Sequence, residues 1–385
     1  MNATGGTTFT DPVTSRTVRR LTAGGLNVSP YFNSYAWTAD GDWFFFLRLD
    51  GHELYVMGCE VATGHLHKVS GPFPGPQAEG SMTWPTLNAI PGTRAATFVA
   101  EKAVWRLEID RGKAEKVAEL PTRDFDIGDS DVSSDGRWHM MGCVWMNDAV
   151  RAELVTAGWP PDAVFRKRQI GTQLLRVNLD SGATEELWEE PAVVDHISVN
   201  PTDADLVLYC HEGAIPYRYG RMFLRRVGDE SSLPVRDQRS GRVWVTHECW
   251  FSDGRRIAYH GLYRLDPPES PLVHYVGIYD TARQLPHEYT FPDASLSAWH
   301  SIPSPHGDRL VMDQRGGQDG LFLLTPDQAT GICHVEQLTS ICSDGAAIPR
   351  DQWREQDPIW SPDGKWVLFR AALKGEIDVY AVEAG

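Results

Sequence analysis

In the segment Gln352-Trp-Arg-Glu-Gln-Asp357, three oxygen-donor side chains could bind a metal, namely those of Gln352, Glu355 and Asp357. Alternate residues of an extended chain share one side, so Glu355 and Asp357 are expected to point the same way. His300 could add an imidazole nitrogen to this set. Such donors favour Mn²⁺, Ca²⁺ or Mg²⁺ over a metal that prefers thiolates. The sequence therefore predicts a divalent-metal site, with the binding of an anionic small molecule as the alternative.

Other histidines and acids recur at one position of a repeated motif. WSPDGKWVLF at 360–369 returns as WTADGDWFFF at 37–46 and WFSDGRRIAY at 250–259, with weaker copies starting at 88, 132, 199 and 302. Seven residues before each turn glycine, or its equivalent Asp203, stand Ser34, Pro85, Asp129, His196, His247, His300 and Asp357. The strand after each turn ends, in four copies, at His211, His260, Asp313 and Arg370, and Arg218 and Arg221 follow His211. We expect these residues to converge on one face, which is typical of a functional site.

The elements that must position these residues are short antiparallel strands. Asp or Asn with Gly accepts the dihedral angles of a tight turn, and the alternating apolar flanks predict a strand on each side. A third and usually a fourth strand follow, as in 53–57 and 67–69. Seven such copies predict an all-β fold, a seven-bladed β-propeller, rather than two packed β-sandwiches.

Ring closure is predicted from the two ends of the chain. The last copy stops at 378–382, one strand short, and 16–22 supplies a spare strand that would complete it. Closure of this kind leaves no open sheet edge. We therefore predict one domain over residues 1–385.

Composition excludes several classes of partner. The formal net charge is −16, which argues against nucleic acid and anionic membrane surfaces. The sequence has no run of about 18 apolar residues, so no membrane span is predicted. The six cysteines are scattered without a CxxC pair, as expected of reduced thiols in a cytoplasmic protein. Nothing in the sequence indicates the oligomeric state.

The chain resembles the oligogalacturonate lyases, which are cytoplasmic seven-bladed propellers. The resemblance runs through DPVTSRTVRRLT at 11–22, CHEG at 210–213, THECW at 246–250 and PIWSPDG at 358–364. The two His-Glu segments are its most specific part, because Asp-Gly turns are common to many propellers. The resemblance implies a lyase that cleaves small uronate oligosaccharides, such as pectin fragments, by β-elimination.

The resemblance also assigns roles to individual residues. It implies that His247 is the base that removes the C5 proton and that Arg221 meets the substrate carboxylate, with Arg218 as the alternative. It matches His300 and Gln352 to metal ligands. Further contacts to the substrate are expected from three residues at the same face, namely His196, His211 and Tyr217.

Two positions depart from the family. Where it has a His-Pro-His segment, this chain has Glu355 and Asp357, which exchange two imidazoles for two carboxylates. Either a metal persists with harder ligands, or the substrate differs, or activity is lost. Two other functions therefore stay open, a non-catalytic propeller that binds a protein and another sugar-acid enzyme, such as a hydrolase or isomerase. The loop after Gly213 also differs, and Tyr217 and Tyr219 in it are candidates to protonate the leaving group.

Overall fold

The computed structural model describes residues 6–75, 86–121, 125–157, 162–212, 220–238, 242–265, 270–314, 320–345, 348 and 351–385, without the side chains at 162, 166, 351 and 352. In this part of the chain α-helix is confined to α1 (Asp148–Ala157) and α2 (Asp162–Arg168), and strands dominate. The prediction of an all-β fold is therefore confirmed. Within the same residues, no helix has the length and apolar character needed to cross a membrane.

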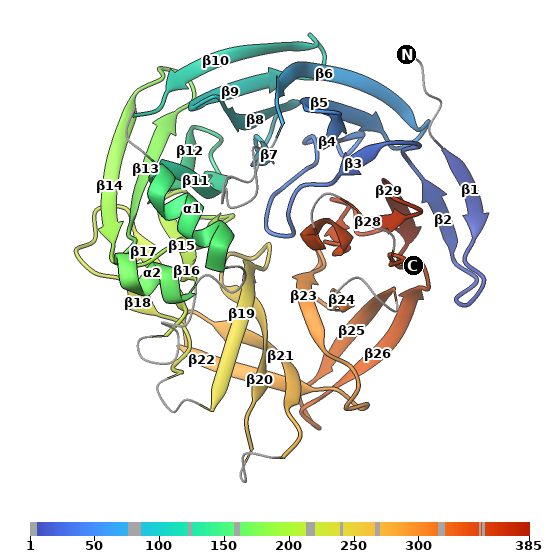
Figure 1. The fold of residues 1–385 in the computed structure, drawn as a ribbon. Helices are drawn as coiled ribbons and strands as arrows, with labels where there is room; N and C mark the ends of the chain where they lie inside the picture. Colours follow the sequence, from blue (N-terminus) through green and yellow to red (C-terminus); the bar gives the residue numbers. More distant parts are fainter. Residues whose placement is uncertain are drawn as a thin grey trace.

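Strands that follow one another in sequence pair in order and form antiparallel groups around a common centre (Figure 1). The first group is β3 (Leu26–Val28), β4 (Trp43–Asp50), β5 (Glu53–Glu60) and β6 (His65–Pro74). The second is β7 (Leu87–Ala89), β8 (Ala95–Ala100), β9 (Ala103–Glu108) and β10 (Lys113–Glu119). The third is β11 (Phe125–Val132), β12 (Trp138–Trp145), β13 (Thr172–Asn178) and β14 (Thr184–Glu190).

The remaining groups continue this order. The fourth is β15 (Val194–Val199), β16 (Leu206–His211), β17 (Met222–Arg226) and β18 (Leu233–Pro234). The fifth is β19 (Val243–Trp250), β20 (Arg256–Tyr263), β21 (Val273–Asp280) and β22 (Leu285–Thr290). The sixth is β23 (Ala298–Pro303), β24 (Leu310–Gln314), β25 (Leu321–Asp327) and β26 (Ile332–Thr339).

The last group joins the two ends of the chain. It contains β27 (Ile359–Trp360), β28 (Trp366–Leu373) and β29 (Glu376–Glu383), preceded by the 3-10 helix η2 (Asp351–Arg354). The N-terminal strand β2 (Thr17–Arg20) pairs antiparallel with β29, Val18 opposite Val382, and β1 (Thr7–Thr10) pairs with β2.

The hydrophobic core lies between neighbouring groups. Phe45 of β4 packs in one buried cluster with Phe98 of β8, and comparable clusters join each later group to the next. One cluster joins the last group to the first, with Phe44 of β4 and Leu368 of β28 both buried in it. Burial of apolar surface on both faces of each sheet therefore fixes the groups relative to one another.

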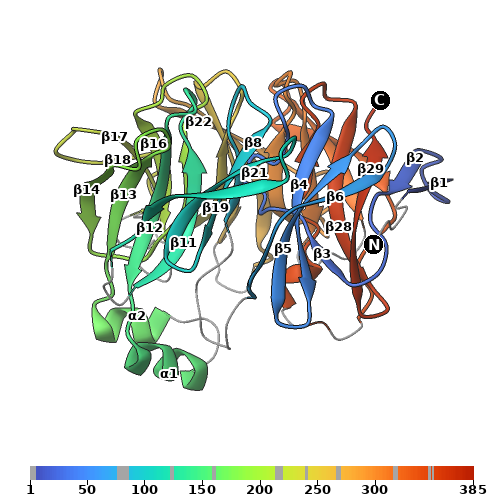
Figure 2. The same ribbon diagram turned by 90° about the horizontal axis from the view of Figure 1, so that it is seen from above.

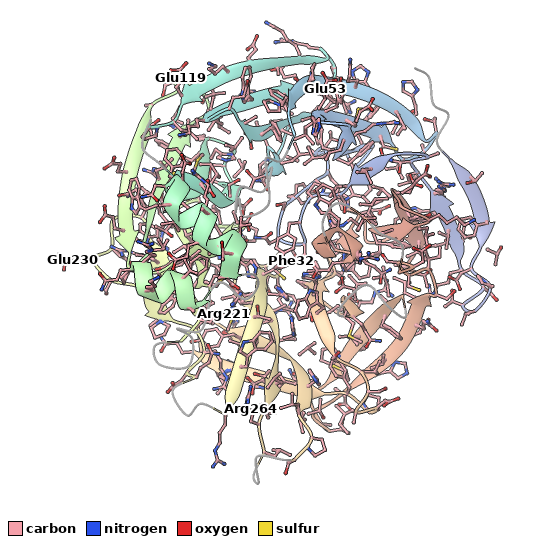
Figure 3. All side chains as sticks on the ribbon, viewed as in Figure 1. Phe32, Glu53, Glu119, Arg221, Glu230 and Arg264 are labelled. Carbon is pink, nitrogen blue, oxygen red and sulfur yellow. The ribbon has the colours of Figure 1, made fainter. Side chains whose placement is uncertain are left out.

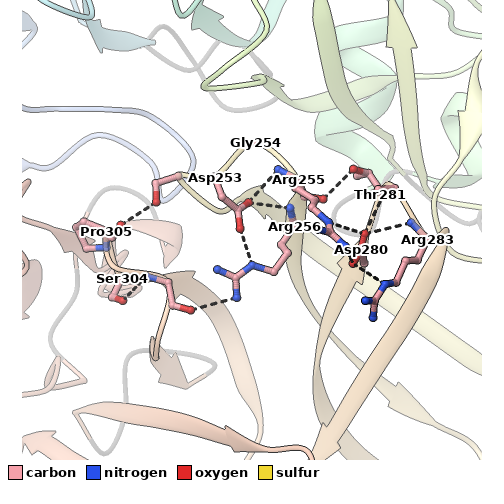
Figure 4. A network of polar contacts seen from close by, with 12 residues as sticks. Asp253, Gly254, Arg255, Arg256, Asp280, Thr281, Arg283, Ser304 and Pro305 are labelled. Carbon is pink, nitrogen blue, oxygen red and sulfur yellow. Dashed lines mark hydrogen bonds and ion pairs between the residues drawn. The ribbon is translucent and has the colours of Figure 1, made fainter.

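The Asp-Gly turns link neighbouring groups at one end of the strands (Figure 4). The Asp253 carboxylate accepts hydrogen bonds from the backbone N–H groups of Arg255 and Arg256, both at 2.9 Å, and Gly254 has a φ of 65°. Arg256 pairs with Asp253 at 2.6 Å and donates to the carbonyl oxygen of Gly307 in the next turn at 3.2 Å. The helices α1 and α2 project beyond the other end of the strands (Figure 2), the end at which the innermost strands begin.

Candidate active site with a potential metal centre

Bulges near the start of the innermost strands aim four side chains at the centre. In β11, β15, β19 and β23, two consecutive residues face one residue of the partner strand. Each bulge contains one of the positions indexed from the sequence, namely Asp129, His196, His247 and His300. A bulge redirects side chains out of the regular alternation, and such irregularities are frequent beside active sites.

Backbone conformation marks the same positions. The φ angles are 52° for His196, 52° for His247 and 42° for Asp357, all in the left-handed region. For residues other than glycine this conformation costs on the order of 1–3 kcal/mol, and it persists where surrounding contacts enforce it. All three side chains are buried.

The histidines lie against one another. The ring centroid of His247 is 5.2 Å from that of His196 and 4.5 Å from that of His300. His247 Nδ1 contacts the carbonyl oxygen of Trp299 and lies 2.7 Å from His260 Nε2. Because a carbonyl oxygen only accepts, His247 Nδ1 carries the proton and Nε2 keeps its lone pair. Burial and the neighbouring His300 lower the pKa of His247 well below its ordinary value, so the ring is a neutral base at pH 7.

Phe32 covers these histidines. Its ring stacks on His300 at 4.8 Å and lies 5.3 Å from both His196 and His247. The side chain is 3% exposed and lies near the centre of the ring of strands (Figure 3). Tyr31 adds an edge contact to His300 at 5.5 Å. Phe32 and Tyr31 therefore shield the histidines on the side on which they pack.

Truncation of Phe32 tests this closure. We expect Phe32→Ala to speed modification of the buried histidines by diethyl pyrocarbonate severalfold, as mapped by peptide mass spectrometry. Phe98→Ala is the matched control, because it removes an equally buried ring between β8 and its neighbours and costs a similar 3–5 kcal/mol or so. Equal acceleration by both variants would indicate general loosening and contradict a local cover.

A potential metal centre adjoins the histidines. Ligand atoms of His300, Glu355 and Asp357 lie within 4.8 Å of one another. His300 Nε2 is buried and has no hydrogen-bond partner among the described residues. Glu355 is held by Trp299, whose indole Nε1 donates to its carboxylate at 2.9 Å. One imidazole and two carboxylates are a donor set that suits Mn²⁺.

Charges around this group are only partly balanced. His300 Nδ1 lies 3.0 Å from Asp313 and 3.3 Å from Asp357, and Arg370 forms an ion pair with Asp357. Burial opposes protonation of His300, but Asp313 and Asp357 raise its pKa to about 9. Burial raises the pKa of Glu355 to about 7. A cation that displaced the protons from His300 and Glu355 would face three carboxylates and one guanidinium, so a divalent ion would balance the two remaining negative charges.

A second buried cluster surrounds Arg221. Ligand atoms of His196, Cys210 and Glu248 also lie within 4.8 Å of one another, and His196 Nδ1 is 3.3 Å from Glu248. Arg221 is buried beside Cys210 and Glu248 and pairs with Glu212 at 2.6 Å. The guanidinium disfavours a cation there, so we interpret this cluster as an ion-pair network rather than a metal centre.

Not every residue indexed from the sequence joins the centre. His211 Nε2 pairs with Glu190 at 3.0 Å and packs against Phe223 at 4.4 Å, in a network separate from the other histidines. The positions of Pro85, Tyr217 and Arg218 lie outside the described residues, and so does the side chain of Gln352. Their roles remain predictions.

Two important contributors escape the sequence analysis. Glu248 follows His247, and strict alternation would place it on the opposite side of the strand. The bulge at 247–248 instead brings it to His196. Phe32 lies in a segment that precedes the first copy of the repeated motif. Only the two adjacent aromatic residues, Tyr31 and Phe32, could have indicated a role for this segment. His260, Asp313 and Arg370 were indexed as strand ends and contact His247, His300 and Asp357 respectively.

Comparison with known proteins gives a consistent result. No family model matches the chain. The oligogalacturonide lyase of Pectobacterium atrosepticum is 24% identical over 225 residues, 54% of each protein, so the match spans about half the length of that relative. A solved oligogalacturonate lyase in complex with manganese superposes with a TM-score of 0.80 at 19% identity, covering 98% of this chain and 96% of that one.

A second structure decides the fold. The oligogalacturonate lyase of Vibrio parahaemolyticus superposes with a TM-score of 0.81 at 18% identity, covering 100% of this chain and 98% of that one. The chain has the fold of the oligogalacturonate lyases. The predicted resemblance to this family is thus confirmed for the fold over the whole length and in sequence over 225 residues. Within the oligogalacturonate lyase fold, this chain carries Glu355 and Asp357 beside His300.

Proposed function

We propose that this protein is a lyase that cleaves small uronate-containing oligosaccharides by β-elimination, with galacturonate oligomers as the first substrate class. The observation that carries the proposal is His247, a buried neutral histidine whose tautomer leaves Nε2 free to act as a base. The fold shared with two oligogalacturonate lyases supports it. Left-handed backbone conformations at His196 and His247 also support a functional site, because such conformations cluster at active sites and ligand-binding sites.

The reaction needs a base and a positive charge. The C5 proton of a uronate lies next to the carboxylate and becomes acidic when the charge that develops on that carboxylate is neutralised. His247 Nε2 would accept the C5 proton, and Arg221 would orient the carboxylate. Arg221 is paired with Glu212 at 2.6 Å, so the substrate carboxylate has to compete with Glu212 for the guanidinium.

We also propose a divalent cation, Mn²⁺ first, at His300, Glu355 and Asp357, with Gln352 as a fourth candidate ligand. The unpartnered His300 Nε2 and the nearby carboxylates of Glu355 and Asp357 fit a cation that displaces their protons. When bound, the ion would supply positive charge close to the uronate carboxylate. His196, His211, Tyr217 and Arg218 remain proposed substrate contacts.

The functional test is a direct assay. Saturated and unsaturated galacturonate oligomers, and glucuronate-linked ones, are incubated with the purified protein and Mn²⁺. Elimination creates a C4–C5 double bond conjugated with the carboxyl group, which is followed by ultraviolet absorbance and product mass. Hydrolysis products with the added mass of water would instead favour a hydrolase, and no product from any oligomer would count against an enzyme.

Metal binding is tested through stability. At free Mn²⁺ about 100-fold above Kd, we expect the free energy of unfolding to rise by about 2.7 kcal/mol. Glu355→Gln should lose most of this gain, because it removes one charged donor. Glu119→Gln is the control, since Glu119 lies at the periphery of the molecule (Figure 3). Equal gains in both variants would place the ion elsewhere.

For the architecture, we propose a seven-bladed propeller of one domain, residues 1–385, with β2 as the outer strand of the last blade. Two features support this interpretation. Val18 pairs with Val382, and buried clusters lie between successive groups, including the last and the first. A cytoplasmic location stays a prediction from the cysteine distribution.

A further inference from the structure

Two neighbouring histidines of the candidate site have opposite surroundings. The His247 ring donates from Nδ1 to a neutral carbonyl group, whereas His196 Nδ1 faces the Glu248 carboxylate at 3.3 Å. The two ring centroids are 5.2 Å apart, and both side chains are aimed at the centre by equivalent bulges. One ring is thus held as a base and its neighbour is held beside an anion that favours the charged form.

We propose that His196 is the general acid that protonates the leaving oxygen, with Glu248 as the positioning residue that keeps it charged. This inference rests on the proposed function and extends it to the second proton of the reaction. Since Nδ1 faces Glu248, Nε2–H is the group that would donate to the C4 oxygen.

The proton and electron balance closes within the pair. His247 Nε2 takes the C5 proton, and the C5–H electrons form the C4–C5 double bond as the C4–O bond breaks. The departing oxygen takes the proton from His196 Nε2. The cycle ends with His247 charged and His196 neutral, and water returns the proton from one to the other.

The groups that face His196 favour its charged form. Glu248 is completely buried, and neither of its carboxylate oxygens has a hydrogen-bond partner of good geometry among the described residues. The positive charges that stabilise the Glu248 carboxylate come from His196 and Arg221. Burial opposes protonation, but Glu248 and then Asp195 raise the pKa of His196 above its ordinary value, with Arg221 acting against them. The other groups against the ring are Tyr31, Phe32, Asp129, Cys210 and His247.

The test compares two leaving groups. On a galacturonate oligomer, His196→Gln is expected to lower kcat about 10²–10⁴-fold, the usual contribution of a general acid. On a galacturonate that carries a nitrophenoxy group at C4, whose oxygen departs without protonation, the same variant should keep near wild-type activity. His247→Ala should lose activity on both. His139→Gln is the matched control, because His139 is a buried histidine outside this centre. Its Nδ1 lies 2.8 Å from Thr97 Oγ1.

A pH profile provides a second, independent readout. The acid form of His196 is required, so activity falls as the pH rises through its pKa. Glu248→Gln removes the charge that raises this pKa, and the alkaline limb should move to lower pH. Equal losses of His196→Gln on both substrates, or an unmoved limb in Glu248→Gln, would overturn the proposal while the lyase activity stands. Wild-type protein inactive on both substrates would instead overturn the proposed function.

Discussion

Replacing His247 by alanine is expected to lower kcat for uronate elimination about 10²–10⁴-fold. The buried imidazole supplies the base, and its Nδ1 is held at the carbonyl oxygen of Trp299. KM should change little, because the side chain acts on the C5 proton rather than on binding of the sugar. Initial rates on a galacturonate trimer, followed by the absorbance of the new double bond, measure the effect.

Two controls make this result interpretable. His139→Ala removes a buried histidine from β12 and should keep the wild-type rate. Circular dichroism and the Mn²⁺-dependent gain in stability show whether His247→Ala is still folded. A folded His247→Ala protein with the wild-type rate would show that another group removes the proton.

Replacing Arg370 by alanine is expected to have the largest effect on stability. Arg370 and Asp357 are both fully buried and form an ion pair, and Asp313 lies in the same group. Removing the guanidinium leaves uncompensated carboxylates in the interior, which typically costs about 3–5 kcal/mol. Mn²⁺ should restore part of this loss, because it adds positive charge to the same carboxylates. Urea unfolding with and without Mn²⁺ measures both effects.

A surface ion pair provides the comparison. Arg226 pairs with Asp203 at the exposed end of β17, and Arg226→Ala should cost no more than about 1 kcal/mol. If Arg370→Ala cost as little as Arg226→Ala, the buried pair would not be the source of stability that we infer. If Mn²⁺ stabilised the two variants equally, the ion would not bind beside Asp357.

The sequence predicts the fold class and the position of the centre well, because both depend on local periodicity. Each turn of the repeated motif fixes the register of two strands, so counting back from the turn locates His196, His247, His300 and Asp357. The structure has these four side chains buried. The strand-end residues Asp313 and Arg370 follow from the same register.

Other parts of the centre depend on features that have no period. A bulge changes which side of a strand a residue faces, so the contact of Glu248 with His196 could not be derived from alternation. Phe32 reaches the histidines from a segment before the first repeat, through packing between residues far apart in sequence. The same limitation applies to the pairing of His211 with Glu190, which the repeat does not predict.

A crystal structure of the His247→Asn variant with a galacturonate trimer and Mn²⁺ would test the central claim most directly. We predict anomalous scattering from manganese among His300, Glu355 and Asp357, and a uronate whose C5 lies beside position 247 with Phe32 displaced. Manganese and sugar bound at another face of the molecule, or a trimer that leaves Phe32 on the histidines at saturating concentration, would contradict it.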